Sequence, residues 1–289
     1  MLAILLWGGN AIIAKASATI IAPAELNFAR WLLAALLLAP FAALQIMRNR
    51  AALVRQLPRL CVLGLFGSAL FPFLMYVAAG YTTATKVGII QTLMPLIAIG
   101  LSAAFFRGAI GRGVLAGAAL SMAGVIVVIT NGQPGMLLMQ SPNRGDLIML
   151  AATACFALYS VLLARWRGPI PMAASMFVQA CTAVAAMVPI MLLTEAKDLE
   201  PAAVPLIAYA GVLGSVAAPL LWMQGVALIG SSRASLLFNL LPLVTAGLAV
   251  VLLGEPLSAP LIIGAMLLLA GVVMAEQAAK KLPTHSANN

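Results

Sequence analysis

The residues of this sequence that could do chemistry are polar side chains placed inside long apolar runs. They are aromatic, amide, hydroxyl and cationic groups, which can hold a solute by hydrogen bonds and charge. Polar and ionisable groups at membrane depth are costly and usually functional. We therefore predict that a solute is bound by Trp7, Asn10, Arg30, Tyr76, Lys86, Gln91, Thr92, Tyr159, Gln179, Trp222 and Asn239.

Each group also has a structural interpretation. Trp7, Tyr76 and Trp222 could be packing or interface aromatics, and Lys15 and Lys86 could extend their ammonium groups to the membrane surface. For Glu255 and Glu276 we expect positions at the membrane interface.

The acidic residues do not assemble a catalytic site. All seven fall near helix ends or in loops: Glu25, Asp146, Glu195, Asp198, Glu200, Glu255 and Glu276. The single histidine, His285, lies in the polar tail, and hydroxyls such as Ser68 and Ser215 have no base beside them. Because no acid–base pair or metal-ligand cluster can be formed, we expect no enzyme activity, no metal and no cofactor.

Two prolines fall in the middle of apolar runs, Pro95 in "KVGIIQTLMPLIAIG" and Pro242 in "RASLLFNLLPLVTAG". A proline in a helix interior removes a backbone hydrogen bond and crowds the preceding turn. We expect both prolines to bend their helices and to expose carbonyls to a wet cavity, beside Thr92 and Asn239. The alternative is a static kink that a neighbouring helix satisfies.

These residues must be positioned by membrane-spanning helices. The chain has 289 residues, of which 64% are hydrophobic and only 8% charged, whereas soluble domains carry about 25% charged residues. A span needs about 20 mostly apolar residues, and ten segments qualify: 2–22, 24–47, 57–80, 82–106, 110–131, 146–165, 170–194, 203–227, 231–253 and 257–277.

The first apolar segment could instead be a signal peptide, but this alternative is weaker than a membrane span. The sequence Ala16-Ser17-Ala18 resembles a signal-peptide cleavage site, but no basic segment precedes it and every later segment also spans.

Cys61, Cys155 and Cys181 lie inside apolar stretches without metal-ligand spacing, so we expect them to be buried small hydrophobic residues.

The cations set the orientation. If both termini share one side, eleven of the sixteen Lys and Arg residues lie there: Arg48, Arg50, Arg55, Arg59, Arg107, Arg112, Arg165, Arg167, Arg233, Lys280 and Lys281. This distribution follows the positive-inside rule better than it matches a nucleic-acid-binding surface. We expect both termini in the cytoplasm and the chain in a bacterial-type cytoplasmic (inner) membrane.

The sequence repeats. A shift of 147 places Pro95 on Pro242 and, without a gap, "GS" at 67–68 on "GS" at 214–215. The same shift pairs Pro58, Gly64, Pro72, Lys86, Gly100, Gly117 and Gly124 with Pro205, Gly211, Pro219, Arg233, Gly247, Gly264 and Gly271. A shift near 149 pairs Asn10, Phe28, Arg30 and Pro40 with Tyr159, Phe177, Gln179 and Pro189.

We therefore predict an all-α membrane protein of two five-helix repeats, at 1–132 and 146–278, followed by a polar tail at 279–289. Because five is odd, the second repeat enters the membrane from the other side. Inverted repeats can exchange inward-open and outward-open arrangements around a midplane site.

Several stretches resemble a known family: "LLWGGNAIIAK", "ATKVGIIQTLMPL", "PLVTAGLAVVLLGEPLS" and "GAMLLLAGVVMA". They are similar to the EamA-type transporters of the drug/metabolite transporter superfamily, over essentially the whole chain. The first repeat departs from the pattern, since Arg107-Gly108 stands where the second has Gly254-Glu255. The resemblance implies a ten-helix carrier that moves small metabolites such as amino acids, usually outward.

The types of charged residue in the sequence narrow the chemical class of the solute. Small multidrug relatives in the superfamily that this sequence resembles use an acid in the first helix to bind cations and exchange protons, but residues 1–14 contain no acid. A neutral, zwitterionic or carboxylate-bearing metabolite fits better. A lipophilic-drug efflux carrier and a non-transporting structural or receptor-like membrane protein remain alternatives. The expected partners are a small solute and the lipid bilayer, with no nucleic acid, and the chain could act as a monomer.

Overall fold

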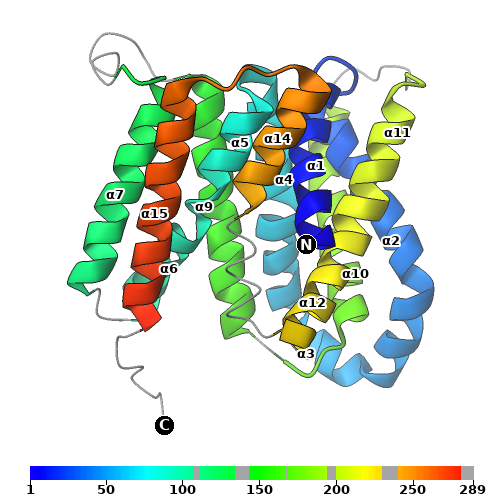
Figure 1. The fold of residues 1–289 in the computed structure, drawn as a ribbon. Helices are drawn as coiled ribbons and strands as arrows, with labels where there is room; N and C mark the ends of the chain where they lie inside the picture. Colours follow the sequence, from blue (N-terminus) through cyan, green and yellow to red (C-terminus); the bar gives the residue numbers. More distant parts are fainter. Residues whose placement is uncertain (107–110, 134–142, 167, 194–199, 230–239, 281–289) are drawn as a thin grey trace.

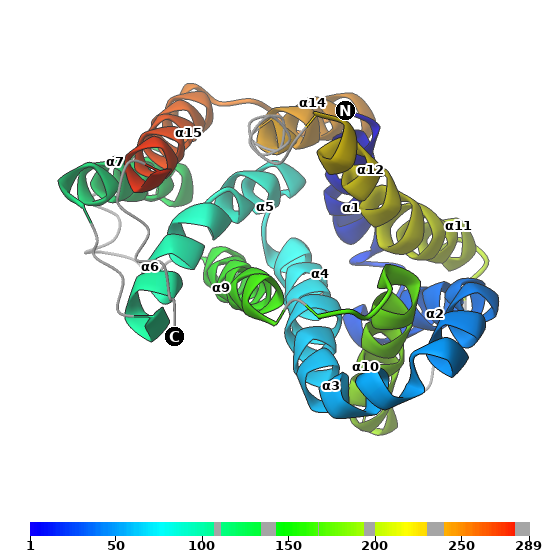
Figure 2. The same cartoon turned by 90° about the horizontal axis from the view of Figure 1, so that it is seen from below.

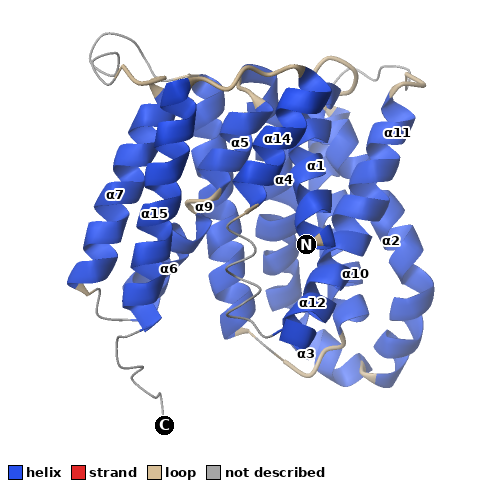
Figure 3. Cartoon of the chain, viewed as in Figure 1, coloured by secondary structure: helices blue, strands red, loops and turns tan. Residues whose placement is uncertain are grey.

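The computed structural model describes residues 1–106, 111–133, 143–166, 168–193, 200–229 and 240–280. Throughout these residues the regular secondary structure is helical, and no strand occurs among them (Figure 3). By length and composition, seven of the described helices could cross a membrane, and three shorter apolar helices accompany them. The prediction of an all-helical membrane protein is therefore confirmed.

The elements follow the chain in order. The first part forms α1 (Leu2–Ser17), α2 (Pro23–Arg48), α3 (Arg50–Leu63), the π-helix η1 (Gly64–Leu70), α4 (Phe71–Tyr81), α5 (Ala84–Gln91), α6 (Met94–Phe106) and α7 (Arg112–Ile129). The second part forms α9 (Arg144–Arg165), α10 (Met172–Leu192), α11 (Ala203–Ala208), the π-helix η2 (Tyr209–Ala217), α12 (Ala218–Ile229), α14 (Leu241–Leu253) and α15 (Ala259–Lys280).

Two expectations about boundaries were wrong. The third segment was expected to begin at residue 57, but α3 already begins at Arg50, after a tight turn at Asn49. Its Ala, Leu, Arg and Gln residues favour helix, so the helix continues beyond the apolar run. The first predicted segment ends at Ser17 rather than at residue 22, and of the segment 231–253 only residues 240–253 lie among the described residues.

The α5–α6 connection is a break rather than a bend. Residues Thr92 and Leu93 form a turn, and Pro95 is the second residue of α6, where a missing N–H costs nothing. Pro242 likewise is the second residue of α14. Both prolines thus occupy the first turn of a new helix in the described chain.

The bundle has an upper and a lower end in the view of Figure 1. The lower end, where α2, α6 and α9 finish and α7 begins, carries Arg48, Arg50, Arg112 and Arg165. The upper end is defined by the connections at 18–22, 82–83 and 254–258. We use these two terms throughout.

Helices α7 and α15 pack closely at one edge of the bundle, opposite α2, α3 and α10 (Figure 2). A Cβ atom built at Gly271 would lie 2.5 Å from the carbonyl oxygen of Gly117, and one at Gly124 would lie 2.5 Å from the amide of Leu268. Small residues at such a crossing allow two backbones to approach in lipid.

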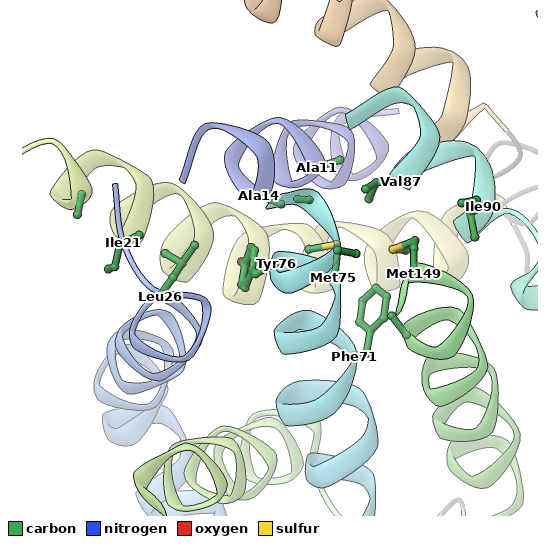
Figure 4. Close-up of a cluster of buried hydrophobic side chains, with 14 residues drawn as sticks. Ala11, Ala14, Ile21, Leu26, Phe71, Met75, Tyr76, Val87, Ile90 and Met149 are labelled. Carbon is green, nitrogen blue, oxygen red and sulfur yellow. The ribbon is translucent and has the colours of Figure 1, made fainter. Parts of the chain in front are cut away.

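Above the centre of the bundle, side chains from α1, α2, α4, α5 and α9 form a buried apolar cluster (Figure 4). Phe71, Met75 and Tyr76 contribute from α4, and Met149 comes from α9. The cysteines do not all share such burial, contrary to expectation: Cys61 and Cys155 are half-buried and Cys181 is exposed.

Candidate functional site

A cavity of about 510 Å³ lies at the centre of the bundle. It is lined from α1, α2, η1, α4, α5, α6, α9, α10, η2, α12 and α15, so both parts of the chain contribute. On α9 the lining residues are Phe156, Tyr159, Ser160 and Leu163, in the half nearer the lower end. The cavity therefore extends toward the arginine-bearing end, and it shares Phe71 and Met75 with the apolar cluster.

Two charged residues of the described structure, Arg30 and Glu276, line the cavity, and the contacts of Arg30 are known in detail. Its side chain is only 4% exposed. The guanidinium donates to Ser215 Oγ from Nε at 2.9 Å and from Nη2 at 2.7 Å, and Nη1 donates to the hydroxyl of Tyr76. Tyr76 in turn donates to Asn10 Oδ1 at 3.4 Å.

These partners of Arg30 are all neutral. No carboxylate among the described residues pairs with the guanidinium. The group lies 5.3 Å from the ring centroid of Trp31 and 5.6 Å from that of Tyr76, distances that allow cation–π attraction. An arginine has five N–H donors, and the three hydrogen bonds above leave two of them for another acceptor.

A π-helix positions the serine that holds Arg30. Ser215 Oγ donates to the carbonyl of Ala210, five residues earlier, at 2.8 Å. In a π-helix the backbone also pairs residues five apart, and such segments often occur at functional sites. The other π-helix, η1, covers residues 64–70, and the 147-residue shift places these on 211–217, inside η2. The two π-helices therefore lie at positions that this shift relates.

Glycines bring these π-helices close to the cavity residues. A Cβ atom at Gly67 would lie 2.5 Å from the ring of Tyr159, and one at Gly214 would lie 3.3 Å from Asn10 Oδ1. Asn10 and Tyr159 are the pair that the 149-residue shift relates. The contact of Gly67 in one part of the chain thus has a counterpart at Gly214 in the other.

Aromatic and thioether side chains form most of the remaining wall. Trp7 and Trp222 face each other with ring centroids 5.7 Å apart, and Phe156 stacks on Phe71 at 4.4 Å. Methionines at 75, 94, 172 and 176 also line the cavity. An apolar body could therefore pack against this wall while its polar group meets Arg30.

Many residues selected from the sequence meet in this cavity. Trp7, Asn10, Arg30, Gln91, Tyr159, Gln179 and Trp222 line it, as does Pro95. Tyr76 is buried behind Arg30 and bonded to it. Asn239 lies outside the described residues.

The other selected residues lie elsewhere. Thr92 is buried, and its hydroxyl donates to the carbonyl of Ile89 at 2.7 Å. Thr92 and Pro242 are not among the cavity residues. Lys86 forms an ion pair with Asp146 at 3.1 Å at the upper end, away from the cavity.

In place of the alternative in which Lys15 and Lys86 extend to the membrane surface, both ammonium groups make contacts within the protein. Lys15 Nζ donates to the carbonyls of Ala79 and Thr82 at the end of α4, at 3.0 and 2.8 Å. Glu255 is likewise not a simple interface residue, because it accepts from the backbone at the start of α5. Glu276 lines the cavity. Lys15, Lys86 and Glu255 find partners on other elements of the fold, which a sequence does not display.

Sequence reasoning missed some of the site. Ser215 was visible as half of the repeated "GS" pair, and its role follows only from the approach of η2 to α2. Trp31 lines the cavity beside Arg30, and its Nε1 is buried without a hydrogen-bond partner in the described structure. No spacing signal distinguishes this tryptophan from a packing residue.

Apolar helices that surround a cavity with a buried charge define a multi-pass membrane protein with an internal solute-sized site. The sequence model of the EamA-like transporter family matches residues 1–130 and 143–276. The chain therefore belongs to the EamA-like transporter family and is a membrane transporter.

Two individual proteins are similar to this chain. One is the "Uncharacterized transporter YyaM" of Bacillus subtilis (strain 168), which is 31% identical over 220 residues, covering 74% of this chain and 71% of the relative. The other is a solved structure titled "Crystal structure of protein", with a TM-score of 0.60 and 22% identity over 98% of this chain and 96% of that one. This second likeness concerns the fold alone.

Proposed function

We propose that this protein is a secondary carrier for a small solute bearing a carboxylate, such as an amino acid or a related zwitterion. The observation that carries the proposal is Arg30, a cavity-wall cation that is 4% exposed and held by neutral partners in the described structure. A buried charge without a counterion is costly. A substrate carboxylate would supply that counterion and accept the remaining N–H groups.

The cavity wall suggests the rest of the solute. The aromatic and methionine side chains favour an apolar body beside the carboxylate. The same wall would suit a lipophilic drug, but the cation at Arg30 disfavours a positively charged one.

We further propose that ten helices form two inverted five-helix repeats, and that transport proceeds by alternating access between them. The matched π-helices η1 and η2 and the matched prolines Pro95 and Pro242 support this arrangement. The arginines of the lower end favour cytoplasmic termini in a bacterial-type inner membrane. With the cavity extending toward that end, loading from the cytoplasm, and hence export, is the favoured direction.

The test is solute flux in reconstituted vesicles, screened over amino acids and related monocarboxylates with and without a pH gradient. Arg30→Gln keeps some hydrogen-bonding capacity and removes the charge. Losing charge-assisted bonds of about 1.5–3 kcal/mol should weaken apparent affinity by about ten- to 150-fold.

The matched control is Arg55→Gln, which removes an exposed cation of the lower end and should leave affinity unchanged. Methyl esters, which lack the carboxylate, should compete poorly with the wild-type substrate. Equal transport by Arg30→Gln, or flux of lipophilic cations in place of carboxylates, would contradict the assignment. If folded protein moves no solute under any gradient, the carrier proposal itself fails.

A further inference from the structure

The connection between α4 and α5, at the upper end, is held by charged side chains from three other elements. Glu255, in the connection between α14 and α15, accepts from the amides of Ala84 and Thr85 at 2.7 and 3.0 Å, and from the Thr85 hydroxyl at 2.7 Å. Its carboxylate thus satisfies the first amides of α5, where the helix dipole also favours a negative charge.

Asp146, in the first turn of α9, holds the same connection from another side. It is fully buried. One carboxylate oxygen accepts from the Thr82 hydroxyl at 2.6 Å, and the other pairs with Lys86 at 3.1 Å. Lys15 of α1 also donates to the carbonyl of Thr82. We call Thr82, Ala84, Thr85, Lys86, Asp146 and Glu255 the upper latch.

The upper latch joins the two parts of the chain. Thr82, Ala84, Thr85 and Lys86 belong to the first repeat, whereas Asp146 and Glu255 belong to the second. The buried apolar cluster includes Ala14, Phe71 and Met75 (Figure 4), and Phe71 and Met75 also line the cavity. We infer that a path to the cavity that opens beside the α4–α5 connection separates groups that the latch holds together.

The sequence of the first repeat lacks one carboxylate of the latch. The 147-residue shift places Gly108 at the position of Glu255, so the first repeat has no carboxylate there. The shift also places Arg233 at the position of Lys86. The carboxylate that fastens the upper end has no counterpart in the sequence for the lower end.

We propose that Asp146 and Glu255 are positioning residues that keep the upper end closed, and that this asymmetry sets the resting state of the carrier with its cavity open toward the lower end. This inference rests on the proposed alternating access. A ligand or contact shifts a conformational equilibrium only through the free-energy difference between its two states. The latch contacts exist only while the upper end is closed, so they bias the equilibrium directly.

The test follows exposure of Ala14→Cys, a position of the apolar cluster that is fully buried on α1. In a background without Cys61, Cys155 and Cys181, an impermeant thiol reagent is added from the upper side of oriented vesicles. Glu255→Gln and Asp146→Asn should each raise the labelling rate by about tenfold or more, since each weakens charge-assisted hydrogen bonds. Glu25→Gln, which removes a carboxylate of the same end that is outside the latch, is the matched control and should leave the rate unchanged.

Two further variants keep the test decisive. Thr85→Ala deletes a single hydroxyl contact to Glu255, so it should fold and give a smaller increase. The exchange Lys86→Asp with Asp146→Lys restores an ion pair and should lower the rate again. Labelling of folded Glu255→Gln, Asp146→Asn and Thr85→Ala at the Glu25→Gln rate overturns the latch.

Flux measured in the same vesicles separates the two proposals. If wild-type protein moves solute while the latch variants label at the control rate, the latch is wrong and the carrier assignment stands. If the latch variants label faster while no solute moves through wild-type protein, the carrier assignment fails and the latch remains a conformational contact.

Discussion

At the residue scale, Arg30 depends on Ser215 for its orientation. Ser215 Oγ accepts from both Nε and Nη2 and is itself fixed by its bond to the carbonyl of Ala210. The serine thus holds the plane of the guanidinium, and with it the direction of the remaining donors. A substrate carboxylate binds such a planar fork best when the fork is already oriented.

Ser215→Ala should therefore impair binding without removing the charge. We expect the apparent KM for a carboxylate solute to rise about three- to tenfold, which is the range for losing neutral hydrogen bonds of 0.5–1.5 kcal/mol. Flux in reconstituted vesicles measures the effect. Ser68→Ala, at the repeat-related position, is the matched control, and an equal effect of both changes would argue against a special role for Ser215.

The sequence selected much of this site, but not its contacts. Arg30, Asn10, Gln91 and Gln179 stand out because polar groups are rare in apolar runs, and all four line the cavity. Lys86 stood out for the same reason yet pairs with Asp146. Rarity shows that a polar group needs a partner at membrane depth, whereas the choice between a solute and a distant side chain depends on tertiary packing.

At the element scale, helices that are apolar on every side give no signal for which face meets which neighbour. Their lengths are nevertheless predictable, because composition alone defines a span. The ranges of α9, α10 and α15 were predicted to within a few residues. The π-helices and the break at Thr92 and Leu93 depend on how the backbone hydrogen bonds adapt to neighbouring helices. The positions of proline and glycine in the sequence do not specify them.

The α7–α15 crossing offers a test of packing. Gly271→Ala places a methyl group where backbone and side-chain atoms of Gly117 and Ser121 lie 2.5 Å away, so the helices must separate. Overpacking of this kind should lower the free energy of unfolding by about 1–3 kcal/mol. Thermal unfolding in detergent measures it.

Gly100→Ala is the matched control, because a Cβ atom there meets nothing within 4 Å. Alanine favours helix over glycine by about 1 kcal/mol, so this variant should be unchanged or more stable. A loss of stability equal to that of Gly271→Ala would mean that the close approach is not what the glycine provides.

At the scale of the whole molecule, the two ends of the bundle should face different compartments. Single cysteines at Arg50 and Arg165, both exposed at the lower end, should be shielded from an impermeant thiol reagent added to intact cells. Cysteines at Gln133 and Ala202, exposed at the upper end, should react. Permeabilised cells, in which all four should react, provide the control, and external labelling of position 50 would reverse the orientation.

The position of Arg30 has an electrical consequence. A guanidinium in a cavity that opens to one compartment and then to the other experiences first one electrical potential and then the other. Moving one elementary charge through the membrane potential changes the free energy by about 2.3 kcal/mol per 100 mV.

In a cell that is negative inside, the potential therefore pulls the empty carrier toward the arrangement that opens to the cytoplasm. A bound monocarboxylate cancels the charge and makes the loaded step indifferent to voltage, whereas a zwitterion does not. Each turnover then moves only the net charge of its cargo, so a steady current across a planar bilayer is expected for a monocarboxylate and none is expected for a zwitterion.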